Sequence, residues 1–179
     1  MAELLHLTKR FFGAVRPGAP SAADEHWATS KLIDGERDVW AAMNNPDRRH
    51  AVAVAKAVVA EFEAAKSDAG EDRAVLAAAL LHDSGKVLSG LRTPGRVLAT
   101  VFWMIAEDPL ADRWLEPSVT GIRRRLAQYR RHPELGAEML AAAGSDPLTV
   151  AWAGDHHRPE SAWAVPAEIG AVLKACDDD

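Results

Sequence analysis

Histidine and aspartate side chains that could bind a metal ion recur along the chain, and the adjacent pair His82 and Asp83 is the most informative. On a regular helix these two side chains would point about 100° apart, because a helix has about 3.6 residues per turn. Both can reach one cation only from a helix end, and Gly85 favours such an end here. Imidazole with carboxylate suits Mn, Fe, Ni, Zn or Mg rather than metals that prefer thiolates.

Other candidate ligands lie near expected helix ends or first turns, and these are His50, His132, His156 and His157. Asp177 adds a carboxylate within the run DDD, where Asp178 could take its place in the same register. Each histidine taken alone is also compatible with an ordinary role, as a partly buried helix residue or a helix cap.

Composition predicts the scaffold that must position these residues. The chain has 179 residues, of which 48% are hydrophobic and 26% charged, as in one globular domain. Alanine is abundant, and the alternating pattern of strands is nearly absent. We therefore expect an all-α bundle of about seven to nine helices, with residues 1–20 as an N-terminal segment and residues 21–179 as the domain.

Apolar periodicity and helix-breaking residues indicate where the helices lie. Asp68 and Glu71 have the spacing of a capping box for the helix expected over residues 71–83. Residues 93–109 are apolar enough to form one buried helix, and the six tryptophans are expected in the core rather than stacked on a base. The other expected helices span residues 47–66, 71–83, 109–117, 118–131, 132–144, 147–156 and 166–179.

Charge and composition exclude several classes of protein. A net charge of −5 argues against binding of duplex nucleic acid. The most apolar window, residues 97–106, is about half as long as a membrane span needs. The single cysteine, Cys176, forms no intrachain disulfide, and the N-terminus lacks the basic region of a signal peptide, so we expect a cytoplasmic protein.

The apolar residues near the N-terminus are expected to dock on the domain or on a second subunit rather than on a membrane, because few cations accompany them. A homodimer is compatible with this expectation. The residues concerned are Leu4, Leu5, Leu7, Phe11 and Phe12.

Over residues 50–177 the chain resembles the HD superfamily of metal-dependent phosphohydrolases. The resemblance is carried by the order and helical context of His50, the doublet in LLHDSGK and Asp177 in LKACD. Members of that family have an all-α domain in which these residues ligate a divalent metal. The resemblance therefore implies metal-ligand roles for His50, His82, Asp83 and Asp177. It also implies that Lys86, the lysine of LLHDSGK, faces the substrate phosphate.

A further resemblance concerns the branch typified by HD-GYP phosphodiesterases, which bind more than one metal. The segment HPELGAEML and the pair His156-His157 look like the additional ligands of that branch. The resemblance implies a second metal site formed by His132, His156 and His157, with Asp83 bridging two ions. The chain continues RPESAWAVP and has no GYP element, so cyclic dinucleotide specificity is not implied.

These residues predict a metal-dependent phosphohydrolase with one or two divalent ions, acting on a nucleotide or another small phosphate ester. Asp83 would orient the attacking water, and Lys86 would stabilise charge on the phosphoryl oxygens. Arg92 and Arg96 are additional candidates for phosphate binding, because the planar guanidinium fork suits phosphate. The arginines at 123–125, 130 and 131 are expected to be mainly solvated.

Two alternatives remain open at the level of the sequence. Some histidine-rich members of the HD superfamily are mixed-valent di-iron oxygenases, and the six or seven candidate ligands are compatible with that chemistry. A non-catalytic module that binds a metal or a nucleotide for regulation is the other alternative. The sequence does not specify the substrate, the metal or the oligomeric state.

Overall fold

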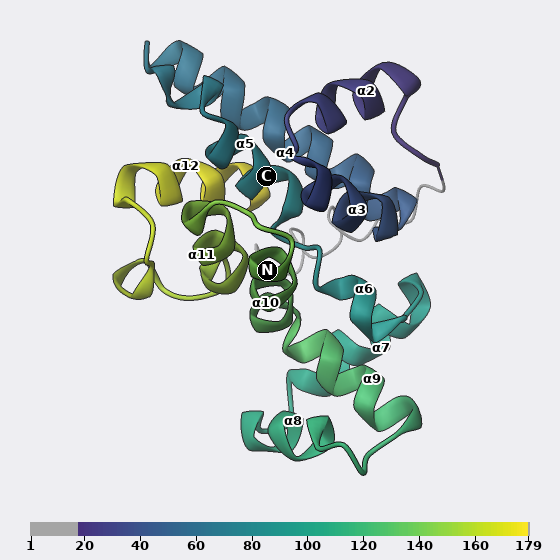
Figure 1. Cartoon of the computed structure of the whole chain (residues 1–179). Helices are drawn as coiled ribbons and strands as arrows, with labels where there is room; N and C mark the ends of the chain where they lie inside the picture. Colours follow the sequence, from purple (N-terminus) through teal and green to yellow (C-terminus); the bar gives the residue numbers. More distant parts are fainter. Residues whose placement is uncertain (1–17, 179) are drawn as a thin grey trace.

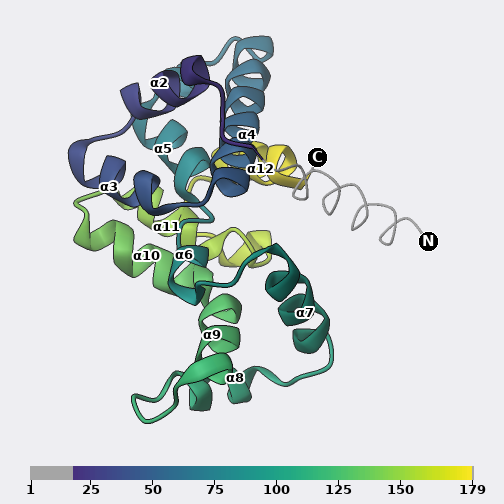
Figure 2. The same ribbon diagram turned by 90° about the vertical axis from the view of Figure 1, so that its right-hand side faces the viewer.

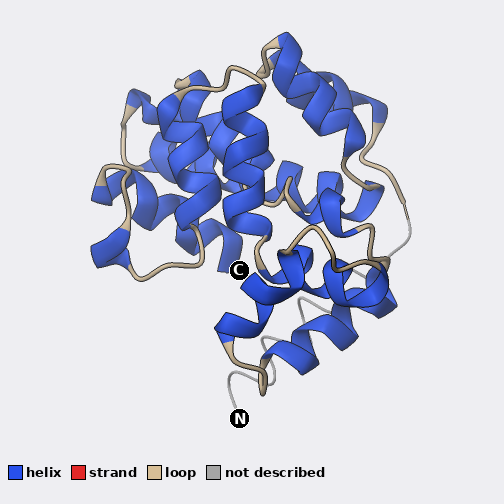
Figure 3. Ribbon diagram, turned by 60° about the horizontal axis from the view of Figure 1, so that its bottom comes forward, coloured by secondary structure: helices blue, strands red, loops and turns tan. Residues whose placement is uncertain are grey.

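The computed structural model describes residues 18–178, and these residues form helices and connecting turns with no strand (Figures 1 and 3). The predicted all-α fold is confirmed. The apolar residues at positions 4–12, for which docking was expected, lie outside the described residues. The helices are α2 (Ala22–Ser30), α3 (Asp34–Ala42), α4 (Asn45–Ala64), η1 (Asp68–Glu71), α5 (Arg73–Leu81), α6 (Lys86–Ser89), α7 (Thr93–Trp103), α8 (Asp108–Leu115), α9 (Gly121–Arg130), α10 (His132–Ala142), α11 (Pro147–Asp155), η2 (Glu160–Ala162) and α12 (Ala167–Asp178).

Helix α5 is the centre of the larger of two hydrophobic clusters. Every residue from Ala74 to Leu81 is buried, so this helix is apolar on all sides and has neighbours all round. It packs against α4 and α11, while α12 packs on α4 and α10 on α11. The residues that follow α5 are therefore delivered to the interior of the bundle.

Helix α4 carries His50 on its second turn. Asn44 caps the helix by accepting a hydrogen bond from the Asp47 amide at 3.0 Å, and Pro46 occupies the first turn, where no amide hydrogen is needed. The predicted apolar face is confirmed, because Val54, Val58 and Phe62 are buried.

The predicted capping box of α5 is wrong. Asp68 to Glu71 form the 3-10 helix η1, and the cap is Asp72, whose carboxylate accepts a hydrogen bond from the Ala74 amide at 2.7 Å. The spacing of Asp68 and Glu71 suits a cap, but the tight turn after α4 uses these residues before α5 begins.

The expectation of one buried helix over residues 93–109 is also wrong. Helix α7 ends at Trp103, and its Leu98 side chain is exposed. α7 belongs to a smaller cluster with α8 and α9, which lies below the main bundle in Figure 1 and covers only one side of α7. Trp103 faces that side and donates its Nε1–H to the Leu126 carbonyl at 3.0 Å.

The tryptophans contribute to both clusters, as expected from the composition. Trp40, Trp103 and Trp152 are buried, and the other three are partly buried against the clusters. Within residues 18–178 no single helix is long and apolar enough to cross a membrane, whereas the bent pair Arg73–Ser89 and Thr93–Trp103 passes this test by length and composition when the two parts are taken together.

We predict that Leu76→Ala lowers the free energy of unfolding by about 2–5 kcal/mol, because it leaves a cavity in a helix surrounded by core. Leu98→Ala is the matched control, and its effect should stay within about 0.5 kcal/mol, since that side chain is exposed. Urea denaturation followed by far-UV circular dichroism measures both. Equal losses in the two variants would contradict the central position of α5.

Candidate metal centre

The His82-Asp83 doublet lies at a helix end, as its spacing requires. Helix α5 stops at Leu81, and residues 82–85 form consecutive turns that lead into α6. Because the doublet has left the regular helix, the two side chains converge, with His82 Nε2 at 3.6 Å from Asp83 Oδ2. Both residues are buried.

Gly85 allows this turn to lie directly against the start of α10. A Cβ atom at position 85 would lie 2.0 Å from the His132 carbonyl oxygen and 2.7 Å from the Gly136 nitrogen. Both of these are backbone atoms that cannot move aside independently. The glycine therefore permits the close backbone contact that brings His132 to within 3.3 Å of Asp83, measured from Nε2 to Oδ1.

A first group of candidate ligands joins three helices. His50 Nε2, on α4, lies 3.0 Å from Asp177 Oδ1, on α12. His82 Nε2 lies 3.3 Å from the same oxygen. Ligand atoms of His50, His82 and Asp83 all lie within 4.8 Å of one another, a spacing that could hold one ion. The four residues predicted from the HD resemblance thus converge on one point.

A second group lies on the other side of Asp83. His132 begins α10, while His156 and His157 directly follow α11, and their candidate ligand atoms lie within 4.8 Å of one another. His156 Nε2 is 3.7 Å from Asp83 Oδ1. Asp83 therefore faces His82 with one oxygen and the second group with the other, which is the geometry of a bridging carboxylate.

Three of the histidines are held in one orientation by backbone carbonyls. The Nδ1 atoms lie 2.8–3.0 Å from the carbonyl oxygen three residues earlier, which can only accept a hydrogen bond, so each Nδ1 carries the hydrogen. In a neutral ring this leaves the lone pair on Nε2, the atom that faces the centre. The pairs are His82 with Ala79, His132 with Tyr129, and His156 with Ala153.

The atoms that face the centre are buried and lack a hydrogen-bond partner. Among the described residues, the Nε2 atoms of His82, His132 and His156 and Oδ1 of Asp83 have no hydrogen-bond partner. Buried polar groups are normally paired, and leaving one unpaired costs about 1–3 kcal/mol. Nitrogen lone pairs that point at a negatively charged carboxylate are unfavourable unless a cation lies between them. These nitrogen and oxygen atoms therefore fit a divalent metal as ligands.

The ionisation of the first group is set by its carboxylates. Burial lowers the pKa of His82, but the negative charges of Asp83 and Asp177 outweigh burial and raise that pKa to about 9. Burial raises the pKa of Asp83, yet the nearby Lys86 and His82 hold it well below the usual range. Burial also raises the pKa of Asp177, and there His82 and His50 hold it well below the usual range. Both carboxylates are therefore ionised at neutral pH.

Two histidines of the second group, His132 and His157, are neutral at physiological pH. Burial lowers the pKa of His132 and lowers that of His157 to about 2, where the neighbouring His156 and His132 add to the effect. Neutral imidazoles are the form that binds metals, so these two histidines need no deprotonation to act as ligands.

Among the predicted phosphate-binding residues, Lys86 is the one that contacts the centre. Its ammonium group pairs with Asp83 Oδ2, and although burial lowers its pKa, the charge of Asp83 raises it more, so Lys86 stays protonated. Arg96 is held by both oxygens of Asp47, at 2.6 and 2.8 Å, and by the Leu91 carbonyl. Arg92 is exposed just before α7. The predicted roles of these two arginines stay predictions.

Two features of the centre were not accessible from the sequence pattern. Tyr129 has no place among the predicted site residues, yet its ring stacks on His132 with centroids 5.8 Å apart, and its carbonyl orients the same histidine. Its position three residues before His132 is the signal that could have indicated this role. The register at the C-terminus is that of Asp177, since Asp178 pairs with Lys174 at 2.6 Å.

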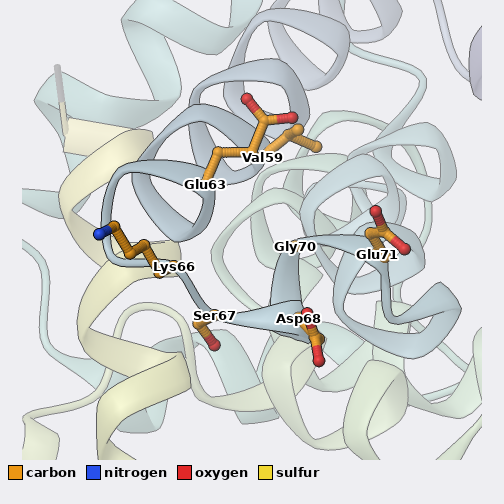
Figure 4. A pocket seen from close by; sticks show the side chains of 7 residues that line it. All are labelled: Val59, Glu63, Lys66, Ser67, Asp68, Gly70 and Glu71. Carbon is orange, nitrogen blue, oxygen red and sulfur yellow. The ribbon is translucent and has the colours of Figure 1, made fainter.

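A surface pocket near the C-terminal end of α4 is separate from this centre (Figure 4). None of the residues that line it belongs to either histidine group. They are Val59, Glu63, Lys66, Ser67, Asp68, Gly70 and Glu71.

Comparisons of the chain with protein-family models, with curated proteins and with solved structures give no significant match. The convergence of the buried histidine and aspartate side chains is therefore the main support for a metal centre.

We predict that the metal-free protein loses stability as the pH rises from about 6.5 to about 9. The pKa of His82 is raised from 6.5 to about 9 on folding, so its stabilising contribution is complete below pH 6.5 and is lost as the pH rises through 9. Saturating metal should remove this decline, because ligation displaces the Nε2 proton. Urea midpoints at several pH values, with and without chelator, measure the effect.

The matched control is His26→Gln, at an exposed position on α2 outside the centre, which should leave the decline unchanged. His82→Gln should abolish it. A metal-free stability that rises over this pH range would contradict the assigned protonation of His82.

Proposed function

We propose that this chain is a metal-dependent phosphohydrolase of the HD type, acting on a nucleotide or another small phosphate ester. The observation that supports this best is the convergence of three buried, carbonyl-oriented Nε2 atoms on the carboxylate of Asp83. A partly buried lysine beside the same carboxylate adds a cation suited to phosphate. The motifs that resemble the HD superfamily contribute these residues.

The first group, with Asp177, would hold one ion, and the second group would hold another, with Asp83 between them. A divalent ion bound there would lower the pKa of a coordinated water and polarise a phosphoryl oxygen. The ligands that would hold it are already oriented, because the Nδ1 hydrogen bonds fix three of the rings. Little reorganisation would then accompany the reaction.

Differences in exposure indicate the side from which a substrate would enter. His82 and His156 are almost completely buried and form the floor of the centre. The side chains of His50 and Lys86 are 41% and 19% exposed. His157 of the second group is exposed as well. A phosphate group that enters beside Lys86 would meet its ammonium, which Asp83 holds in place and keeps charged. Lys86 would thus bind and orient a phosphoryl oxygen.

The histidine content of the centre also favours a second candidate, a mixed-valent di-iron oxygenase. Asp83 links two histidine-containing groups, and three histidines in the second group are available to one ion. Two spin-coupled irons in the purified protein, detected by Mössbauer and electron paramagnetic resonance spectroscopy, with no turnover of phosphate esters, would support the oxygenase. A regulatory module would bind a phosphate ester without cleaving it.

We predict that Asp83→Ala abolishes phosphohydrolase activity and releases metal while far-UV circular dichroism stays close to that of the wild type. The loss follows because this carboxylate serves both groups, whereas the apolar core of α5 is unchanged. Activity is measured in a phosphatase and phosphodiesterase screen with Mn, Fe, Ni, Zn or Mg. Asp34→Ala on α3 is the control, since that carboxylate is almost fully exposed and pairs with Arg37, which does not belong to the centre.

An Asp83→Ala variant that keeps more than about a tenth of the wild-type rate, a change of only about 1.4 kcal/mol in the barrier, would contradict an essential role.

We predict that the double variant His132→Ala/His156→Ala binds about one equivalent of metal where the wild type binds about two, because it removes two of the three histidines of the second group. Mass spectrometry of metal content after dialysis measures this. The control is His26→Ala/His6→Ala, which changes two histidines with no assigned role. An unchanged metal content in the test variant would instead place His132 and His156 as contacts to the substrate.

A further inference from the structure

Helix α7 presents an apolar stripe that the rest of the described chain does not cover. The stripe consists of Pro94, Leu98 and Val101 on α7 and Ile105 in the turn that continues it, where the Ala106 amide donates to the Phe102 carbonyl at 3.0 Å. The spacing of four, three and four residues places them on one face. Leu98, Val101 and Ile105 are 70%, 58% and 86% exposed. A contiguous exposed apolar surface of this kind marks an interaction site.

The stripe faces away from the molecule. Ala99 and Trp103 lie on the opposite side of α7, where they are buried in the smaller cluster that includes α9. Figure 2 shows α7 at the edge of the structure, with its outer side free of other described helices. No charged residue occurs between Arg96 and Glu107, so the stripe has no charged side chain within it.

We propose that this stripe binds the same stripe of a second copy of the chain, forming a two-fold symmetric dimer through antiparallel α7 helices. A two-fold contact requires one surface to be complementary to itself. The spacing of the stripe meets this requirement, because it reads the same in both directions about the midpoint between Ala99 and Thr100. Leu98 then faces the second copy's Val101, and Pro94 faces its Ile105.

Charges that flank the stripe favour the antiparallel arrangement, with Arg92 directly before α7 and Glu107 four residues after its last residue. Arg92 and Glu107 are both exposed and lie equally far in sequence from the same midpoint. The antiparallel pairing therefore brings opposite charges to the same level at each end, whereas a parallel pairing would place like charges together. Glu107 also disfavours a membrane as the occupant, since helices that lie on anionic lipid flank their apolar face with lysine and arginine.

The interface is small, because one helix from each copy supplies it. Interfaces that bury less than about 1,200 Å² belong to weak, reversible complexes. We therefore expect a dimer that dissociates in the micromolar range. This dimer is independent of the metal centre, whose ligands lie on other helices.

Sedimentation equilibrium of the full chain from about 1 to 200 μM tests the proposal, over the range in which a micromolar complex dissociates. The wild type should dimerise with rising concentration. Leu98→Glu should raise the dissociation constant by at least about tenfold, since it buries two charges beside the two-fold axis. Ile122→Glu is the matched control: it also replaces an exposed apolar residue, but on α9, which lies on the other side of α7.

A charge exchange tests the orientation. Arg92→Glu should weaken the dimer, and the double variant Arg92→Glu/Glu107→Arg should restore it to within about twofold of the wild type. A wild type that is monomeric throughout, a dimer that Leu98→Glu leaves intact, or a double variant that fails to recover would each overturn the proposed antiparallel pairing.

Two further measurements identify other occupants if the wild type is monomeric, and each positive result overturns the proposal. Slow reaction of Leu98→Cys with a thiol reagent would indicate that residues 1–17 cover the stripe; the wild type, whose Cys176 is buried, is the blank. Binding to phosphatidylglycerol vesicles that is lost in Leu98→Glu would indicate a membrane.

Discussion

The geometry of the centre depends on one carboxylate that two groups of histidines share. Asp83 can face both groups only if four chain segments end or begin within a few ångströms of it. Two of those segments show the constraint directly. Helix α5 ends at the residue immediately before the doublet, and α10 begins with His132 against the turn at Gly85. The backbone contact at Gly85 leaves no room for a side chain, so the distance between the two histidine groups is set by main-chain packing rather than by flexible side chains.

Burying this many polar and charged side chains lowers the stability of the fold, and the apolar packing of the surrounding helices offsets that loss. Charged groups in a protein interior lose hydration that only partners can replace. In the first group the carboxylates obtain partners from His50, His82 and Lys86, whereas burial keeps His132 and His157 of the second group neutral. The fully apolar α5 and its neighbours bury side chains on every side, so the fold does not depend on the polar centre for its core.

The sequence predicted the parts of the structure that local rules determine. A doublet followed by glycine requires a helix end, and Asn44 with Pro46 determines where α4 begins. It could not predict features that depend on which helices meet. The burial of residues 93–109 was predicted from composition alone, which does not say what covers a helix. The family resemblance favoured Asp177 but left Asp178 as a substitute, and the packing of α12 on α4 is what brings Asp177 to His50.

The carbonyls that orient the histidine rings have an electrostatic consequence of their own. Ala79, Tyr129 and Ala153 lie in the last turns of α5, α9 and α11, so three helices direct their C-terminal ends toward the same point. Each helix dipole contributes roughly half a negative charge at that end. Anion sites usually lie at the opposite, N-terminal ends of helices. The N-terminal end of α10, which begins with His132, opposes this field with about half a positive charge. The three C-terminal ends outnumber it, so an anionic substrate of the proposed class would approach more readily once a cation was bound.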